Sequence, residues 1–183
     1  MFYYFDPKLY KLPEPRINSD NAMPNVTCQT IIQAPQADVF AIAQDYGVRL
    51  EWDTFSRSLA FKDGATRAAA GVRATGRAWN GIYMEVEYLI VTPPTVAAMT
   101  MIHGPFFFAT FSGSWQFKKL SESTTEVIFK YHYITPWAAL RPLIDSVIGF
   151  VLTREINRRL RDLKHAAEQT DILDRVKDFR RQH

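Results

Sequence analysis

The stretch TEVIFKYHYITPWAALRPLIDSVIGFVLTREINRRLRDLK, residues 125–164, decides the fold because its hydrophobic pattern changes period at Pro136. Before Pro136, apolar and polar side chains alternate, which predicts a strand with one buried face. After it, apolar side chains recur every three or four positions, which predicts a helix of about 25 to 30 residues, roughly 40 Å long. A helix of that length must cross a whole sheet, so we expect the preceding strands to form one.

The residues upstream supply the rest of that sheet. Asn80-Gly81 lies between two alternating segments and is a strong hairpin signal, because both central residues of such a turn need positive φ. Pro93-Pro94 and Gly104-Pro105 cannot continue a hydrogen-bonded ladder and therefore mark turns. Strands joined by such short connections pair antiparallel. The pattern predicts a first strand at 25–33, short helices at 36–44 and 46–53, and strands at 58–62, 72–79, 82–91, 96–102, 106–118 and 124–134.

This order of elements predicts an α+β fold. A seven-stranded curved antiparallel sheet wraps around the long C-terminal helix, and two short helices follow the first strand. The 183 residues fit one domain. We expect residues 1–24, which hold four prolines and no clear period, to be an extended arm or a disordered tail. Residues 25–168 form the predicted ligand-binding domain, and residues 169–183 a charged C-terminal tail.

Cysteine usage and the N-terminus bear on the compartment. The single cysteine, Cys28, excludes an internal disulfide framework. The first residues lack the basic start and long apolar run of a signal peptide, and the most apolar internal run is too short to span a bilayer. We therefore expect a cytoplasmic protein without a transmembrane segment.

Several short motifs resemble those of one superfamily. They are IQAP at 32–35 followed by Val39-Phe40, Asp45 with EWD at 51–53, GSWQF at 113–117, TEV at 125–127 and LRDLK at 160–164. In these motifs and in element order, the sequence from about residue 25 to 168 resembles the Bet v 1/START-like (SRPBCC) superfamily, in particular its polyketide cyclase/dehydrase and lipid-transport branch. The resemblance implies a helix-grip fold with a hydrophobic cavity. Similar proteins include lipid and hormone carriers and aromatase/cyclases, which share no invariant catalytic set.

Side-chain alternation predicts which rings face that cavity. One side of segment 106–118 turns polar along its length, so we expect Phe107, Phe111 and Trp115 on the other, inward side. In 124–134 the aromatic set faces inward by the same logic. There the hydroxyls of Tyr131 and Tyr133 bond either to a ligand oxygen or to backbone and water. The predicted ligand-binding residues are Trp52, Arg73, Arg77, Phe107, Phe111, Trp115, Phe129, Tyr131 and Tyr133.

The hairpin around Asn80-Gly81 leaves two alternatives open. A two-residue loop pairs Arg77 with Met84, and both faces of the resulting ladder are mixed. If Arg73 and Arg77 face inward, they hold a carboxylate or polarise a carbonyl of the ligand. In the other alternative they lie exposed on the convex face.

The inventory of catalytic motifs is thin. The four histidines show no metal-ligand spacing, and the chain holds no glycine-rich phosphate loop or nucleophile elbow. We therefore predict no metal and no cofactor, and assign no catalytic residue. Nine Lys and Arg against six Asp and Glu from Thr153 onward account for the whole net charge of +3, but no nucleic-acid motif accompanies them.

Three functions fit these observations. The first is a carrier or sequestering protein that binds an apolar or aromatic small molecule, lipid-, polyketide- or isoprenoid-like, in the cavity. The second is a polyketide cyclase/aromatase-like enzyme, of cyclase/dehydratase type, in which the cavity orients an enolisable substrate by its shape and by Tyr131, Tyr133 and an inward Arg73 or Arg77. The third is a domain whose basic C-terminal helix makes peripheral contact with a membrane or docks on a protein.

Overall fold

The computed structural model describes residues 25–169 and 171–176, so the predicted N-terminal arm, residues 1–24, lies outside it. The described chain forms one seven-stranded antiparallel sheet in the order β1-β7-β6-β5-β4-β3-β2, which confirms the predicted α+β fold. The elements are β1 (Asn25–Ile32), α1 (Gln36–Gln44), α2 (Tyr46–Trp52), β2 (Ser56–Phe61), β3 (Arg73–Ala78), β4 (Tyr83–Thr92), β5 (Val96–His103), β6 (Thr110–Ser121), β7 (Thr124–Ile134), the 3-10 turn Ala138–Leu140, and α3 (Arg141–Gln169).

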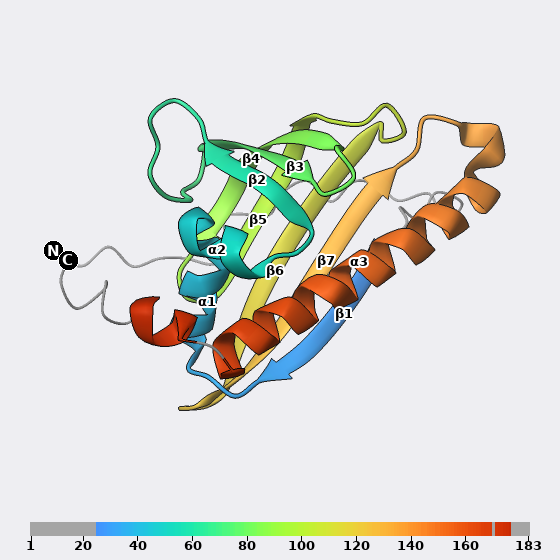
Figure 1. The fold of residues 1–183 in the computed structure, drawn as a ribbon. Helices are drawn as coiled ribbons and strands as arrows, with labels where there is room; N and C mark the ends of the chain where they lie inside the picture. Colours follow the sequence, from blue (N-terminus) through green and yellow to red (C-terminus); the bar gives the residue numbers. More distant parts are fainter. Residues whose placement is uncertain (1–24, 170, 177–183) are drawn as a thin grey trace, which may run out of the picture.

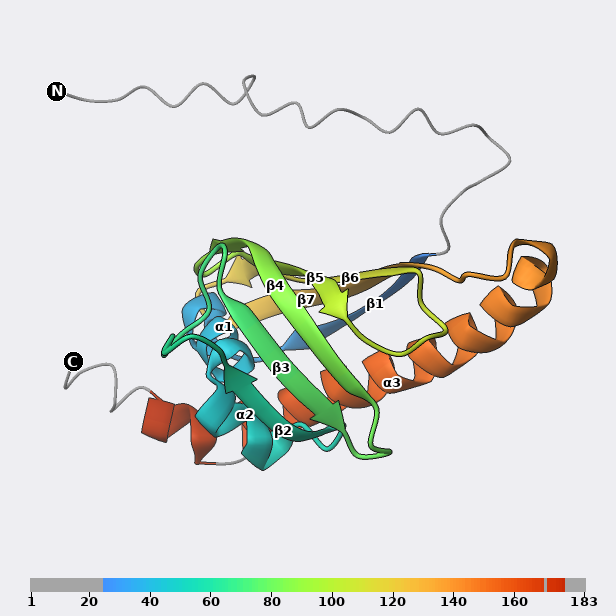
Figure 2. The ribbon, with the colours of Figure 1, turned by 90° about the horizontal axis from the view of Figure 1, so that it is seen from above.

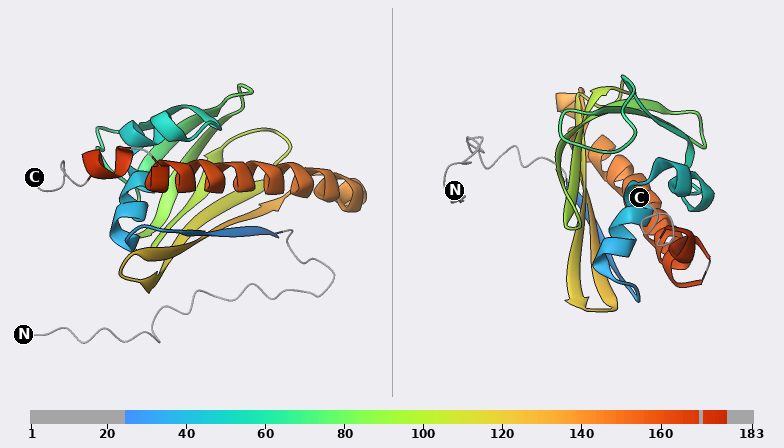
Figure 3. Two further views of the ribbon diagram at one scale, coloured as in Figure 1. Left: turned by 60° about the horizontal axis from the view of Figure 1, so that its bottom comes forward. Right: turned by 90° about the vertical axis from the view of Figure 1, so that its left-hand side faces the viewer.

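The sheet curls around α3. Figures 1 and 2 show α3 running diagonally along the sheet, with β1 and β7 beside its middle. Figure 3 shows β2, β3 and β4 folding over toward the helix from the other side, so that α3 lies within the curl. The helix has 29 residues, as its long apolar stripe predicts.

That stripe does not face the core along its whole length. In the second half of α3, Ile156, Leu160 and Leu163 are fully buried. In the first half, Val147 and Val151 are 58% and 50% exposed. The stripe is therefore buried only in the second half of α3, because the first half of the helix extends beyond the strands that cover the second half (Figures 1 and 2).

The two short helices close one end of the curl. Pro35 immediately precedes α1, where its missing N–H costs nothing. The Asp45 carboxylate caps α2 by accepting hydrogen bonds from the backbone N–H groups of Gly47 and Val48. Trp52 is buried, and its indole Nε1 donates to the Ile42 carbonyl at 3.2 Å. This bond ties α2 to α1.

The hairpin between β3 and β4 has a different register from the predicted one. Arg77 pairs with Tyr83 and not with Met84. The Ala78 N–H donates to the Ile82 carbonyl, so the loop holds three residues, with Gly81 at φ +86°. A three-residue loop that ends in a left-handed residue is a common hairpin connection, and it shifts every pair by one position.

The predicted strand 106–118 also begins too early. The Phe108 N–H donates to the Pro105 carbonyl at 3.1 Å, so residues 105–108 form a turn, and β6 begins at Thr110. From Phe111 to Phe117 the predicted alternation is correct, with every second side chain buried.

Beyond α3, residues 172–176 are helical and pack back onto the domain. Ile172 and Val176 are buried in the hydrophobic core, and Arg175 pairs with Glu51 of α2 at 2.6 Å. Among the described helices, none combines the length and hydropathy needed to cross a bilayer.

Candidate functional site

A cavity of about 570 Å³ lies between the concave side of the sheet and α3. This volume falls within the range of about 300–1,000 Å³ that is typical of small-molecule sites. Strands β2 to β7 contribute most of its wall, and α3 contributes Ile144, Ile148 and Leu152. The apolar side chains on the sheet side include Leu59, Met84, Val86, Met99, Met101 and Phe111.

A row of aromatic rings from β6 and β7 forms one wall. The Trp115 and Phe129 rings stack with centroids 3.9 Å apart, and Tyr131 lies 4.8 Å from Phe129 and 4.7 Å from Phe111. All four rings also border the cavity. Each ring therefore packs against its neighbours in the core and also forms part of the cavity wall.

Gly113 makes room for this row. It pairs with Tyr131 across the strands, and a Cβ on residue 113 would lie 3.0 Å from Tyr131 Cε1. A contact that short forces the ring to move. The glycine thus lets the Tyr131 ring lie over β6 at the height of the cavity.

Of the nine predicted ligand-binding residues, six border the cavity and three do not. The six are Arg77, Phe107, Phe111, Trp115, Phe129 and Tyr131. Trp52 is held in the core by its bond to Ile42. The Tyr133 hydroxyl donates to the backbone carbonyl of Asp145 at 2.9 Å, so its proton is not free for a ligand.

The two arginines of β3 lie on the outer face. In β3 the buried side chains are Ala74 and Ala78, so alternation turns Arg73 and Arg77 outward. Arg73 pairs with Asp63 at 2.8 Å. Arg77 is exposed and borders the cavity, but its guanidinium lies 5.8 Å from the Tyr83 ring centroid and donates to the Gly81 carbonyl. The sequence left an inward and a convex-face position open for Arg73 and Arg77, and in the structure both arginines lie on the convex face.

The inner end of the cavity is polar. The carboxylate of Asp53 is 1% exposed and accepts hydrogen bonds from Arg49 of α2 at 3.0 Å and from Arg159 of α3 at 3.1 Å. A second guanidinium nitrogen of Arg159 donates to the Tyr131 hydroxyl at 2.8 Å. We call Arg49, Asp53, Tyr131, Glu155 and Arg159 the polar end. Of these, Arg49, Tyr131, Glu155 and Arg159 border the cavity.

Aromatic rings surround the Arg159 guanidinium. Its central carbon lies 5.0 Å from the Phe55 ring centroid, 5.2 Å from that of Phe129 and 5.7 Å from that of Trp115. Cation–π attraction therefore offsets part of the cost of burying this charge. Burial raises the pKa of the Tyr131 phenol well above its ordinary value, although the charge of Arg49 acts to lower it. Tyr131 thus stays protonated at physiological pH.

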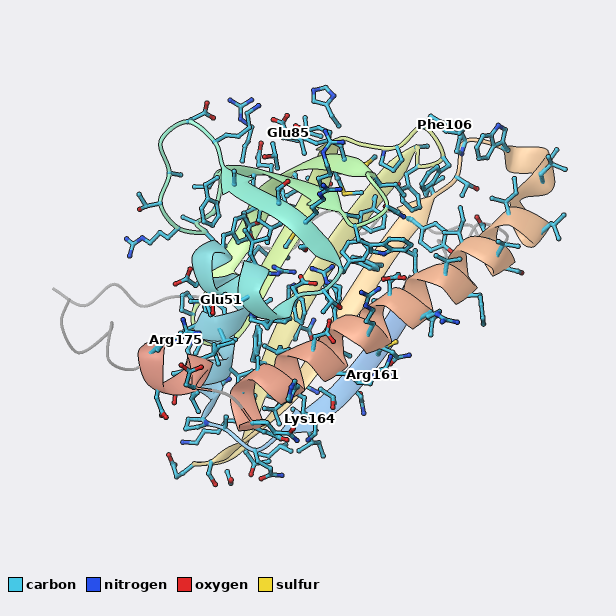
Figure 4. All side chains as sticks on the ribbon, in the orientation of Figure 1. Glu51, Glu85, Phe106, Arg161, Lys164 and Arg175 are labelled. Atoms are coloured by element: carbon cyan, nitrogen blue, oxygen red, sulfur yellow. The ribbon has the colours of Figure 1, made fainter. Side chains whose placement is uncertain are left out.

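The opposite end of the cavity opens through an exposed apolar rim. Trp79 and Ile82 of the β3–β4 loop border the cavity, as do Trp137 and Val147. Figure 4 shows Phe106, which is 81% exposed, at the end of the molecule where α3 begins. We define the rim by the exposed side chains Trp79, Ile82, Phe106, Trp137, Val147 and Val151.

The sequence singled out only Tyr131 of the polar end. Arg49 and Asp53 stand four residues apart, as do Glu155 and Arg159. That spacing puts each pair on one face of a helix. The signal was present, but it did not show which face looks at the cavity.

Within the part of the chain that the structure describes, no group of three or more His, Cys, Asp or Glu side chains is arranged to hold a metal ion.

Comparisons with known proteins agree with this architecture. The sequence profile of the family described as "Polyketide cyclase / dehydrase and lipid transport" matches residues 23–168. No sequence among curated proteins matches the chain.

Solved structures share the fold at low sequence identity. XoxI from Bacillus cereus is 13% identical with a TM-score of 0.67, covering 80% of this chain and 97% of its own. The Zhui aromatase/cyclase from Streptomyces sp. R1128 is 15% identical with a TM-score of 0.66, covering 81% and 95%. Ginseng major latex-like protein 151 from Panax ginseng is 14% identical with a TM-score of 0.62, covering 79% and 97%.

Proposed function

Because the chain belongs to the polyketide cyclase/dehydrase and lipid transport family, we propose that it binds an apolar or aromatic small molecule in the cavity beneath α3, as a carrier or sequestering protein. Lipid-, polyketide- and isoprenoid-like molecules have the required chemistry. The observation that carries the proposal is an apolar cavity of about 570 Å³ that ends at buried polar groups. Such a space, left open beside a closely packed aromatic row, is the arrangement expected of a ligand site and not of a filled core.

A fluorescent apolar probe tests this function. N-phenyl-1-naphthylamine is neutral and gains fluorescence on entering an apolar site, and we expect saturable binding. Val86 borders the cavity from β4, whereas Leu89 of the same strand is 53% exposed on the outer face. Val86→Trp should fill the cavity and weaken binding by at least about tenfold, or 1.4 kcal/mol. Leu89→Trp adds the same ring outside and should leave binding unchanged.

Two outcomes would count against the carrier function. Probe fluorescence that does not saturate with the wild-type protein would exclude a defined site. Equal binding by the wild-type protein and both tryptophan variants would place the probe elsewhere. Native mass spectrometry of freshly purified protein provides an independent measurement, since a retained lipid-like mass is expected for a carrier.

A second candidate function is a cyclase/aromatase-like enzyme that orients an enolisable substrate. The observation that favours it is the polar end, where the Tyr131 phenol and the Glu155 carboxylate border the same apolar space. The hypothesis drawn from the sequence used Arg73 or Arg77, which face outward, so Arg159 takes their place here. We expect faster exchange of the α-protons of 1-phenylbutane-1,3-dione in D₂O, measured by NMR, and loss of that acceleration in Glu155→Gln. Unchanged exchange with wild-type protein would remove this candidate.

Peripheral contact with a membrane remains part of the proposal, but by different residues from those expected. On α3, Arg159 is buried, Arg158 donates to Thr54, and Lys164 donates to Glu168 and to the Ile31 carbonyl. The apolar rim offers a better contact with lipid, because tryptophan and phenylalanine side chains favour the membrane interface. We expect co-sedimentation with neutral phosphatidylcholine vesicles that Phe106→Ser weakens and Arg161→Ser does not; the reverse pattern would restore the basic helix as the contact.

A further inference from the structure

Three buried polar atoms, two of the polar end and one of the adjacent Trp115, have no hydrogen-bond partner among the described residues. They are Trp115 Nε1, Arg159 Nε and Glu155 Oε2. All three side chains border the cavity. An unsatisfied buried donor or acceptor costs free energy, so such groups are rare in folded proteins. Their concentration at one end of a cavity points to a ligand that supplies the missing partners. Each of the three atoms exposes less than 1 Å² of surface, so that ligand must shift the side chains that cover them as it binds.

Tyr131 adds a fourth group that can form one more hydrogen bond. Its oxygen accepts the hydrogen bond from Arg159, and no described residue accepts a hydrogen bond from its own proton. Tyr133 differs, because its proton goes to the Asp145 carbonyl. The polar end and the adjacent Trp115 therefore offer three donors, from Trp115, Arg159 and Tyr131, together with the acceptor oxygen of Glu155.

The formal charges of the polar end already cancel. Arg49 and Arg159 carry two positive charges, and Asp53 and Glu155 carry two negative ones. Asp53 accepts from both arginines, and the charge of Glu155 reaches the Tyr131 phenol. A ligand carboxylate would add an unbalanced buried charge beside Glu155, which is costly. A neutral oxygen group satisfies the donors without that penalty.

We propose that the ligand is an apolar molecule whose head is a neutral carbonyl or hydroxyl group, held at the polar end by Tyr131 and Arg159, and not a carboxylic acid. A carbonyl oxygen accepts from the phenol. A hydroxyl also donates to Glu155 Oε2. This inference rests on the proposed function, since it names the ligand class of the same cavity.

Four naphthalenes of nearly equal size test the head group. They are 2-ethylnaphthalene, 2-acetonaphthone, 1-(2-naphthyl)ethanol and 2-naphthoate, titrated by displacement of N-phenyl-1-naphthylamine. We expect the ketone and the alcohol to bind about two- to tenfold tighter than the hydrocarbon, as one net hydrogen bond provides. Naphthoate should bind no tighter than the hydrocarbon.

Tyr131→Phe and Glu155→Gln test whether the preference for a head group comes from the polar end, and Tyr133→Phe is the control. Tyr131→Phe should abolish the advantage of the ketone while the hydrocarbon binds as before. Tyr133→Phe removes a hydroxyl that does not border the cavity and should leave the advantage intact. Glu155→Gln raises the formal charge by one and should tighten naphthoate binding by at least about fivefold. Melting curves verify that each variant is folded, and Glu155→Gln keeps the test decisive if Tyr131→Phe is not.

The possible failures are distinguishable. If all four compounds bind equally well, the head-group inference is overturned and the carrier function stands. Tightest binding of naphthoate by the wild-type protein would overturn the inference by showing an anion site. If neither the hydrocarbon nor any other compound binds, the proposed function itself fails and the inference with it.

Discussion

Replacing Asp53 with asparagine removes the one carboxylate that two buried arginines share. Asp53 Oδ2 accepts hydrogen bonds from Arg49 at 3.0 Å, from Arg159 at 3.1 Å and from the Ser56 hydroxyl at 3.0 Å. Arg49 and Arg159 are 3% and 7% exposed, so water does not solvate the guanidinium charges once the carboxylate is gone. Removing one member of a buried ion pair typically costs about 3–5 kcal/mol.

Urea denaturation and thermal melting measure that cost. A loss of about 3–5 kcal/mol is a large fraction of the roughly 5–15 kcal/mol by which domains are usually stable. For a chain of this size it corresponds to a fall in Tm of roughly 6–20 °C. Glu51→Gln is the matched control, because it breaks an ion pair with Arg175 whose side chains are 44% and 49% exposed.

The two replacements should therefore differ sharply. Asp53→Asn shifts the urea midpoint strongly, and Glu51→Gln leaves it close to the wild-type value. Figure 4 shows Glu51 and Arg175 together at the outer end of the short helices. If the free energy of unfolding of Asp53→Asn lies within about 1 kcal/mol of the wild-type value, the reasoning about an uncompensated buried charge is refuted.

Two further predictions concern packing and pH. Trp115 is fully buried and stacked on another ring, so Trp115→Ala should cost about 3–5 kcal/mol in urea denaturation, whereas Phe106→Ala, at an 81% exposed position, should change stability little. Burial acts to raise the pKa of Glu168, but hydrogen bonds from the Gln33 N–H and Lys164 outweigh it and lower that pKa. A lowered folded-state pKa contributes stability at higher pH that is lost as pH falls below about 4.3, so Glu168→Gln should lose less stability than the wild type between pH 5 and about pH 3.

The sequence predicts the fold well because the deciding signals are local and periodic. Alternation over 124–134 and the change of period at Pro136 correspond to β7 and to the start of the helical region. The helices and strands then pack in the order their short connections require. The errors occur where a local detail overrides the period. The β3–β4 loop has three residues in place of two, which shifts the whole register of the hairpin. The turn at Pro105 delays the start of β6 to Thr110.

The candidate site is less predictable, because its polar end joins residues far apart in the chain. The aromatic wall follows from alternation within β6 and β7, and its rings do border the cavity. By contrast, Arg159 reaches Asp53 across 106 positions and Tyr131 across 28. Periodicity assigns an arginine near the end of an apolar stripe to a solvated helix face. Only the packing of α3 against α2 shows that this face is buried.

Arg159 links the stability of the fold to the chemistry of the cavity. Its guanidinium donates to Asp53 and to Tyr131 from two different nitrogens, and a planar fork holds that geometry where an ammonium does not. Arg159→Lys keeps the charge but cannot keep both bonds, so it should loosen Tyr131 more than it destabilises the domain. The ketone should then lose its advantage over the hydrocarbon at a urea midpoint well above that of Asp53→Asn. If Arg159→Lys instead lowers the urea midpoint as much as Asp53→Asn while the ketone keeps its advantage, Arg159 serves only to join the helices, and Tyr131 is held in place by the aromatic row alone.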